Sequence, residues 1–262
     1  MQRDLSTARS FLFVPATRPE RIVKARASGA DAVVVDLEDA VPPQDKAAAR
    51  AGLEALPDDA GIVLRINAAG TLWHADDTRL AAHPGIAAVM LAKAESAEEI
   101  EALGKPVIAL IETARGLAAA RTIAAARGVV RLAFGTIDFM ADLGLTEDGE
   151  AMVVYRAELA LASRLAGIAP PIDGITAAID DGALIAAETR RALAFGFQAR
   201  LAIHPRQIAP IHDAMRPSED EIARAKTIVA AAEASGGGAI RLSGEMIDAP
   251  VVLRARALLA RA

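Results

Sequence analysis

Short apolar runs rich in β-branched residues recur along the chain, and most are followed by a longer helical pattern. Parallel strands that are covered on both faces read as nearly continuous apolar runs, whereas half-exposed strands alternate apolar and polar residues. Eight such runs in 262 residues therefore predict a parallel sheet with helices around it. The runs span residues 10–16, 31–38, 61–67, 85–93, 105–113, 129–138, 170–177 and 199–205.

Helix signals separate these runs. Pro19 occupies a first-turn position, Ser96 and Glu99 form a capping-box pattern, and Gly128 and Gly167 are placed to end helices. Eight strand–helix units predict a (β/α)8 TIM barrel. A doubly wound open sheet is the alternative, but no glycine-rich phosphate fingerprint follows the first strand.

The pattern changes near the end of the chain. A long helical segment runs into three glycines at 236–238, which are typical of a flexible joint, and a final helical segment follows. We therefore expect a catalytic barrel over residues 1–235 and a C-terminal helical appendage over residues 236–262. The last helix carries an apolar face of Val251, Val252, Leu258 and Leu259, which we expect to pack on a neighbouring subunit.

Composition excludes several classes of protein. The net charge of -5 gives no basic footprint for nucleic acid, and the absence of cysteine excludes disulfides and thiolate chemistry. The polar N-terminus and the charged residues within every long apolar run argue against a signal peptide or a membrane span. We expect a soluble cytoplasmic protein that binds neither nucleic acid nor membrane.

Polar side chains occur where the predicted strands end, which is where TIM barrels place their chemistry. A charge that interrupts an apolar run is costly unless it is paired or ligated. The residues at these positions are Asp36, Glu38, Asp39, Arg65, Asn67, Lys93, Glu112, Asp138 and His204.

Glu112 and Asp138 follow adjacent predicted strands. Two facing carboxylates suit a hard cation such as Mg²⁺, which takes one or two protein carboxylates and fills its other positions with water and substrate. The alternative is that each carboxylate forms a structural ion pair with Arg65, Arg115 or Lys93.

Three further strand-end residues have candidate roles. Arg65 is suited to bidentate capture of a substrate carboxylate, to pairing with the acidic residues of the second strand, or to both at once. Lys93 is a candidate Schiff-base lysine, although its charged neighbours disfavour that role. His204, before Pro205, is interpreted as a structural hydrogen-bonding group.

Seven stretches together resemble the citrate lyase β-subunit-like family within the HpcH/HpaI aldolase and malyl-CoA lyase superfamily. The resemblance covers nearly the whole chain in order. The stretches are RSFLFVPATRPERIVKA, GADAVVVDLEDAVPPQDKAAAR, VLRINA, LIETARGL, FGTIDFMADLG, AIHPRQI and GEMIDAPVVLRAR.

The resemblance implies a (β/α)8 barrel with magnesium, or alternatively manganese, held by Glu112 and Asp138. It implies that Arg65 holds the substrate and the developing enolate, with Glu38 and Asp39 binding metal waters or fixing Arg65. It places the residues Phe13, Arg18 and Lys24 near the thioester carrier and Asp248 over the active site of a neighbouring subunit, for which a helix N-cap is the alternative.

The implied reaction is cleavage or formation of a carbon–carbon bond in a 3-hydroxyacyl-CoA thioester such as malyl-, citramalyl- or citryl-CoA, with an acyl-CoA and a small keto acid as partners. Two enzyme alternatives remain: a β subunit of citrate lyase acting on citryl-acyl carrier protein, and a pyruvate aldolase without a thioester. A catalytically silent assembly subunit is disfavoured because Arg65, Glu112 and Asp138 are all present. We also expect a homo-oligomer, most simply a trimer.

Overall fold

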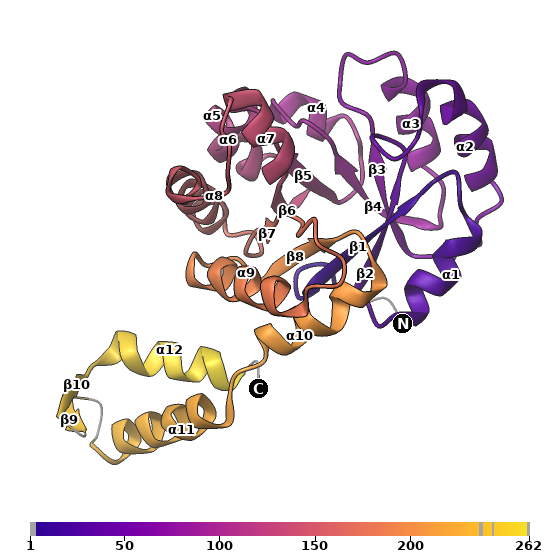
Figure 1. Ribbon diagram of the computed structural model, residues 1–262. Helices are drawn as coiled ribbons and strands as arrows, with labels where there is room; N and C mark the ends of the chain where they lie inside the picture. The colour runs from indigo at the N-terminus through magenta and orange to yellow at the C-terminus, as the bar shows by residue number, and fades with distance from the viewer. Residues whose placement is uncertain (1–3, 236–237, 243, 261–262) are drawn as a thin grey trace. The chain divides into compact units, whose positions relative to one another are not determined.

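Eight parallel strands close into a barrel in the computed structural model, which describes residues 4–235, 238–242 and 244–260. Each strand pairs with the next along the chain, and β8 pairs with β1 (Figure 1). This arrangement confirms the predicted (β/α)8 barrel. The strands are β1 (Ser10–Pro15), β2 (Ala32–Asp36), β3 (Ile62–Ile66), β4 (Ile86–Leu91), β5 (Val107–Ile111), β6 (Val129–Phe134), β7 (Ile172–Asp173) and β8 (Ala199–Ala202).

Helices surround the barrel and connect its strands (Figure 1). They are α1 (Glu20–Ala27), η1 (Pro43–Asp45), α2 (Lys46–Leu53), α3 (His74–Ala81), α4 (Ala97–Glu101), α5 (Ala114–Ala118), α6 (Ala120–Ala125), α7 (Thr136–Leu143), η2 (Glu150–Met152), α8 (Val153–Ala166), α9 (Gly182–Ala194), η3 (Pro205–Gln207) and α10 (Ile208–Met215). The Ser96 hydroxyl accepts a hydrogen bond from the Glu99 amide at the start of α4, as its capping pattern predicts.

Burial on both faces explains the continuous apolar runs. Every residue of β2, β3 and β5 is buried. Alternate strand residues fill the barrel interior, including Phe11, Val34, Met90 and Ile108, while the residues between them pack against the helices.

Two elements differ from the sequence prediction. Only Ile172–Asp173 form a strand within the run at 170–177. Pro170 and Pro171 have no N–H to donate, which accounts for the late start of the strand. The helical pattern at 113–128 is divided into α5 and α6 at Ala119, whose backbone leaves the helical region (φ −94°, ψ 1°).

The chain divides into two compact units, residues 1–212 and 213–262. The division falls within α10, so α11 (Glu219–Ala234) belongs to the second unit, whereas the sequence predicts a boundary at 235/236. Gly236 and Gly237 of the predicted joint lie outside the described residues.

The second unit has its own small core. A hairpin of β9 (Ile240–Leu242) and β10 (Glu245–Ile247) lies between α11 and α12 (Ala249–Leu259) in the chain. Buried residues of this core include Ala225, Ile228 and Ala255, and Val251, Val252, Leu258 and Leu259 pack against them. The apolar face of the last helix therefore has a partner within its own unit, contrary to the expectation that it needs a neighbouring subunit.

Candidate active site

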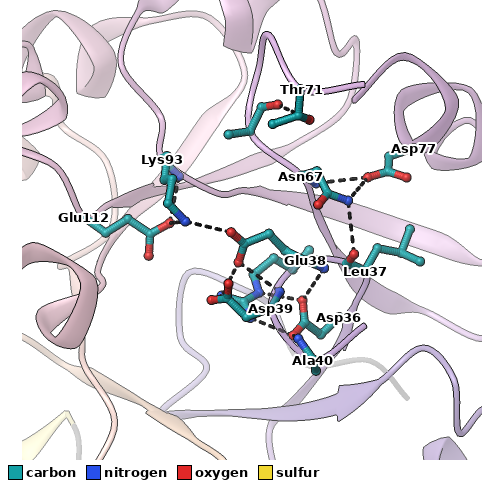
Figure 2. Close-up of polar contacts among 12 residues, drawn as sticks. Asp36, Leu37, Glu38, Asp39, Ala40, Asn67, Thr71, Asp77, Lys93 and Glu112 are labelled. Atoms are coloured by element: carbon teal, nitrogen blue, oxygen red, sulfur yellow. Dashed lines mark hydrogen bonds and ion pairs between the residues drawn. The ribbon is translucent and has the colours of Figure 1, made fainter. Parts of the chain in front are cut away.

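Acidic side chains follow β2, β5 and β6 at the carboxyl-terminal mouth of the barrel. Figure 2 shows those at the ends of β2 and β5. Asp36, Glu38 and Asp39 end or follow β2, Glu112 follows β5, and Asp138 lies in the first turn of α7 after β6. The sequence analysis singled out all five of these carboxylates. The structure shows that two positively charged side chains, Arg65 and Lys93, lie among them.

Arg65 forms a bidentate ion pair with Asp36, its register partner on the neighbouring strand. Arg65 Nε donates to Asp36 Oδ1 over 2.7 Å, and Nη2 donates to Oδ2 over 2.6 Å. Both side chains are buried, and the guanidinium carbon lies 4.7 Å from the centre of the Phe13 ring. The alternative that Arg65 pairs with the acidic cluster is therefore confirmed, and Asp36 orients the guanidinium.

The Glu38 carboxylate lies between two positively charged side chains. Its Oε2 is 3.1 Å from Arg65 Nη1, and its Oε1 accepts a 2.7 Å hydrogen bond from Lys93 Nζ. Asp39 is more exposed and lies 3.5 Å from the same Arg65 nitrogen. These contacts agree with the expectation that Glu38 and Asp39 help to fix Arg65.

Lys93 connects this group to Glu112. Its backbone N–H donates to Glu112 Oε1 over 2.8 Å, and its ammonium lies 3.8 Å from the same oxygen (Figure 2). Burial alone would lower the pKa of Lys93, but the hydrogen bond to Glu38 and the surrounding carboxylates raise it above its ordinary value. A lysine held in its charged form is a poor nucleophile, so the geometry argues against the Schiff-base role.

Glu112 is almost completely buried. Burial raises the pKa of Glu112 to about 8; the carboxylates of Glu38 and Asp138 also raise it, while Lys93 and Arg65 act in the opposite direction. The carboxyl group thus lacks enough positive charge around it to be fully ionised at neutral pH. A bound cation would supply that charge.

Gly135 allows β6 to turn into α7 directly against Glu112. A Cβ added at Gly135 would lie 2.5 Å from Glu112 Cβ and 2.4 Å from Glu112 Oε2. Gly174 similarly has no room for a side chain, because its Cβ would lie 2.2 Å from Thr136 Oγ1. These two close approaches fix the start of α7, and with it Asp138, relative to Glu112.

We expect Gly135→Ala to destabilise the protein by about 1–3 kcal/mol, since the added methyl overlaps a Cβ that cannot rotate away. Calorimetric melting of the metal-free protein tests this, with Gly52→Ala in α2 as control. Apart from its chain neighbours and the adjacent backbone of its own helix, no heavy atom lies within 4 Å of the corresponding Cβ position at Gly52. Equal melting temperatures for the two variants would contradict the steric account.

The acidic group fits a cation that needs few protein ligands. Within the described residues, no group of three or more Asp, Glu or His side chains is arranged to hold a metal ion. The Asp138 carboxylate is nevertheless close enough to Glu112 to help raise the pKa of Glu112. A pair of carboxylates suits Mg²⁺, which keeps waters and substrate oxygens as its other ligands.

A buried lysine supports the loop that carries Glu38. Lys46 Nζ donates to the carbonyls of Leu37 and Glu38 and to Asn67 Oδ1, over 2.7, 2.9 and 2.8 Å. Asn67 is held in turn by Asp77. Sequence reasoning missed Lys46, because a lysine at the start of an alanine-rich helix is indistinguishable in sequence from a solvent-exposed one.

A cavity of about 390 Å³ lies beside the mouth, between β1, α1 and the segment after β8. Phe13 and Lys24, which the resemblance places near the thioester carrier, line it together with His204. Arg21, which the sequence analysis did not single out, lines it as well. Arg18 is not one of its lining residues and forms an exposed ion pair with Glu20. His204 caps η3 by accepting a hydrogen bond from the Arg206 amide, which agrees with its structural interpretation.

Asp248 is the N-cap of α12. Its side chain accepts a hydrogen bond from the Val251 amide over 3.3 Å. This is the capping role that the sequence analysis kept as an alternative.

Comparison with known proteins assigns the family. Residues 9–205 match the model of the family described as HpcH/HpaI aldolase/citrate lyase. The citrate lyase subunit beta-like protein of Mycobacterium tuberculosis (strain ATCC 25618 / H37Rv) is 41% identical, over 96% of this chain and 94% of that protein. A (3S)-malyl-CoA thioesterase of Cereibacter sphaeroides (strain KD131 / KCTC 12085) is 31% identical, over 97% and 94%.

Among solved structures, the protein CitE from Mycobacterium tuberculosis in complex with magnesium, acetoacetate and coenzyme A superimposes with a TM-score of 0.91 at 38% identity. The match covers 98% of this chain and 99% of that one. The barrel and its acidic mouth thus define an enzyme of the carbon–carbon lyase class. The chain belongs to the HpcH/HpaI aldolase/citrate lyase family, as its motifs predict.

No helix in the described parts of the chain is both long and apolar enough to cross a membrane.

Proposed function

We propose that this chain is a magnesium-dependent lyase that cleaves or forms a carbon–carbon bond in a 3-hydroxyacyl-CoA thioester. The observation that carries the proposal is the position of Glu112 and Asp138 after adjacent strands at the carboxyl-terminal mouth of the barrel, with Arg65 near enough to Glu112 to lower its pKa. Magnesium in a solved relative at 38% identity supports the choice of cation, and manganese is the alternative.

Glu112 and Asp138 would hold the cation. When bound, Mg²⁺ supplies a Lewis acid for the carboxylate and carbonyl oxygens of the keto acid. Glu38 and Asp39, which contact Arg65 without being assigned as ligands, would orient Arg65 and metal-bound water. With only two protein ligands, the cation would keep free coordination positions for substrate oxygens.

Cleavage begins when a base takes the proton of the 3-hydroxyl group. The oxygen electrons form the carbonyl of the keto acid while the bond between C2 and C3 breaks, and its electron pair passes to the thioester as an enolate. Arg65 stabilises the enolate oxygen with an N–H that Asp36 does not occupy. Protonation of C2 then gives the acyl-CoA, and we propose Asp248 of a neighbouring subunit as the group that exchanges this proton.

The cavity beside the mouth favours a thioester substrate over a simple pyruvate aldol. Arg21 and Lys24 on its lining are suited to phosphate groups, and Phe13 connects it to Arg65. Coenzyme A in the solved relative supports a soluble carrier, whereas an acyl carrier protein would present the same phosphopantetheine arm.

A coupled assay with malyl-, citramalyl- and citryl-CoA, each with and without Mg²⁺, tests the proposal. We expect magnesium-dependent release of a keto acid and an acyl-CoA from at least one ester. Citryl-acyl carrier protein and a thioester-free hydroxy keto acid are the comparison substrates. Turnover of the thioester-free substrate alone would contradict the proposal.

Charge reversal at Arg21 and Lys24 is expected to raise KM for the CoA ester by about tenfold or more, because each side chain would lose a charge-assisted contact with phosphate. A short thioester without the nucleotide should be unaffected. Arg18→Glu serves as a comparison: the resemblance places Arg18 near the thioester carrier, but its position outside the cavity lining predicts a smaller effect. Equal effects on both substrates would exclude a CoA handle here.

Complementation tests the proposed role of Asp248 in a homo-oligomer, for which we propose a trimer. An Asp248→Ala protein mixed with an Arg65→Ala protein should regain partial activity after subunit exchange, since some mixed sites carry both groups. Sedimentation reports the oligomeric state. Verified mixed oligomers without regained activity would leave Asp248 with its capping role alone.

A further inference from the structure

Lys93 has an unusual backbone for its residue type. Among the described residues it is the only non-glycine residue with positive φ, at 47°. The left-handed region is costly for a lysine, and such residues persist where the surroundings over-determine them, often at functional sites. Here that conformation accompanies the 2.8 Å hydrogen bond from the Lys93 N–H to Glu112 Oε1.

The Lys93 ammonium makes a second, separate contact. It donates to Glu38 Oε1 over 2.7 Å, and the other oxygen of that carboxylate lies 3.1 Å from Arg65 Nη1. Charges therefore alternate in sign from Glu112 through Lys93 and Glu38 to Arg65 (Figure 2 shows the part from Glu112 to Glu38). The chain of contacts joins the candidate metal ligand to the candidate substrate arginine.

We propose that Lys93 is a positioning residue of this site, with its main chain aiming Glu112 at the cation and its ammonium holding Glu38 against Arg65. The inference rests on the proposed function, because it takes Glu112 as a metal ligand. The two roles are separable: the first depends on the φ angle at residue 93, and the second depends on the positive charge of the side chain.

Two uncharged variants isolate the role of the backbone. Lys93→Asn and Lys93→Val both remove the ammonium, but asparagine tolerates the left-handed region and valine does not. We expect the Kd for Mn²⁺ and Mg²⁺, measured by titration calorimetry without substrate, to be about tenfold higher in the valine variant than in the asparagine variant. If the valine protein does not fold, Lys93→Ala compared with Lys93→Gly gives the same contrast.

A double-mutant cycle isolates the role of the ammonium. Lys93→Asn and Glu38→Gln should each weaken binding of pyruvate to the magnesium-loaded protein by about tenfold, and the double variant should be no weaker than the worse single variant. Lys93→Arg, which retains the charge, should keep most of the pyruvate affinity that Lys93→Asn loses. A general loss of structure would not be rescued by arginine in this way.

The outcomes distinguish the inference from the proposed function. If the unmodified protein binds neither cation, or if Glu112→Gln leaves cation binding unchanged, both fail. If those two measurements behave as expected while the Asn and Val variants bind cations equally, the backbone role is overturned. Additive effects of Lys93→Asn and Glu38→Gln would overturn the ammonium role.

Discussion

Replacing Glu112 with glutamine is expected to weaken Mg²⁺ binding by roughly 100-fold or more, because even partners outside the first ligand shell contribute 10- to 100-fold to metal affinity. Turnover of the thioester should fall at least as far. Glutamine has nearly the same shape as glutamate, so the barrel should fold. Asp138→Asn should behave similarly, and calorimetric titration of both variants with Mg²⁺ measures the effect. Unchanged affinity in both would remove these residues from the metal site.

The stability of the metal-free protein provides a second measurement on the same variant. The pKa of Glu112 is raised by burial from 4.5 to about 8, so the folded state holds this proton more tightly than the unfolded state. Its contribution to stability is therefore full below the unfolded pKa and is lost as pH rises through about 8. Between pH 4.5 and about 8, we expect the melting temperature of the metal-free wild-type protein to fall relative to that of Glu112→Gln. Parallel profiles in chelator would contradict the burial argument.

Arg65→Lys is expected to reduce kcat/KM by about 100- to 1,000-fold, the effect of removing one preorganised donor to a developing oxyanion. Lysine keeps the charge but loses the fork that binds both oxygens of Asp36. Since that pair is buried, a stability loss of about 1–3 kcal/mol should accompany the kinetic effect. The expected change in melting temperature is therefore larger than it would be for a residue that contacts only substrate.

Kinetics at a temperature well below the melting transition separate the two effects of Arg65→Lys. Asp36→Asn is the matched variant: it disturbs the same ion pair but retains the guanidinium of Arg65. We expect it to lose stability while retaining more activity than Arg65→Lys. Near-normal kcat/KM in the lysine variant would remove Arg65 from the proposed mechanism.

The sequence was sufficient to predict the barrel and the position of its mouth. Apolar runs such as those at 31–38 and 61–67 are buried on both faces in any parallel arrangement, so their pattern depends on the fold class rather than on exact neighbours. Charges such as Glu112 that end these runs had to lie at one edge of the closed sheet. The family motifs in the same places strengthened that prediction.

Other features depended on tertiary structure. The pairing of Asp36 with Arg65 requires the register of β2 and β3, and Arg65 lies 29 residues further along the chain. The placement of Arg21 on the cavity follows from how α1 packs on β1, and its neighbour Arg18 projects elsewhere. The apolar face of α12 looked unpartnered in sequence because its partner, α11, is recognised only when the hairpin between them folds back.

The sequence by itself determined the fold class, the family and which residue types lie at the mouth of the barrel, because these follow from local periodicity and short motifs. Only the tertiary structure decided which charges pair, since that depends on strand register and on single backbone angles. Lys93 shows the distinction most clearly: its position at a strand end is visible in the sequence. Its positive φ, and the hydrogen bond that it directs to Glu112, come from the packing of β4 beside β5.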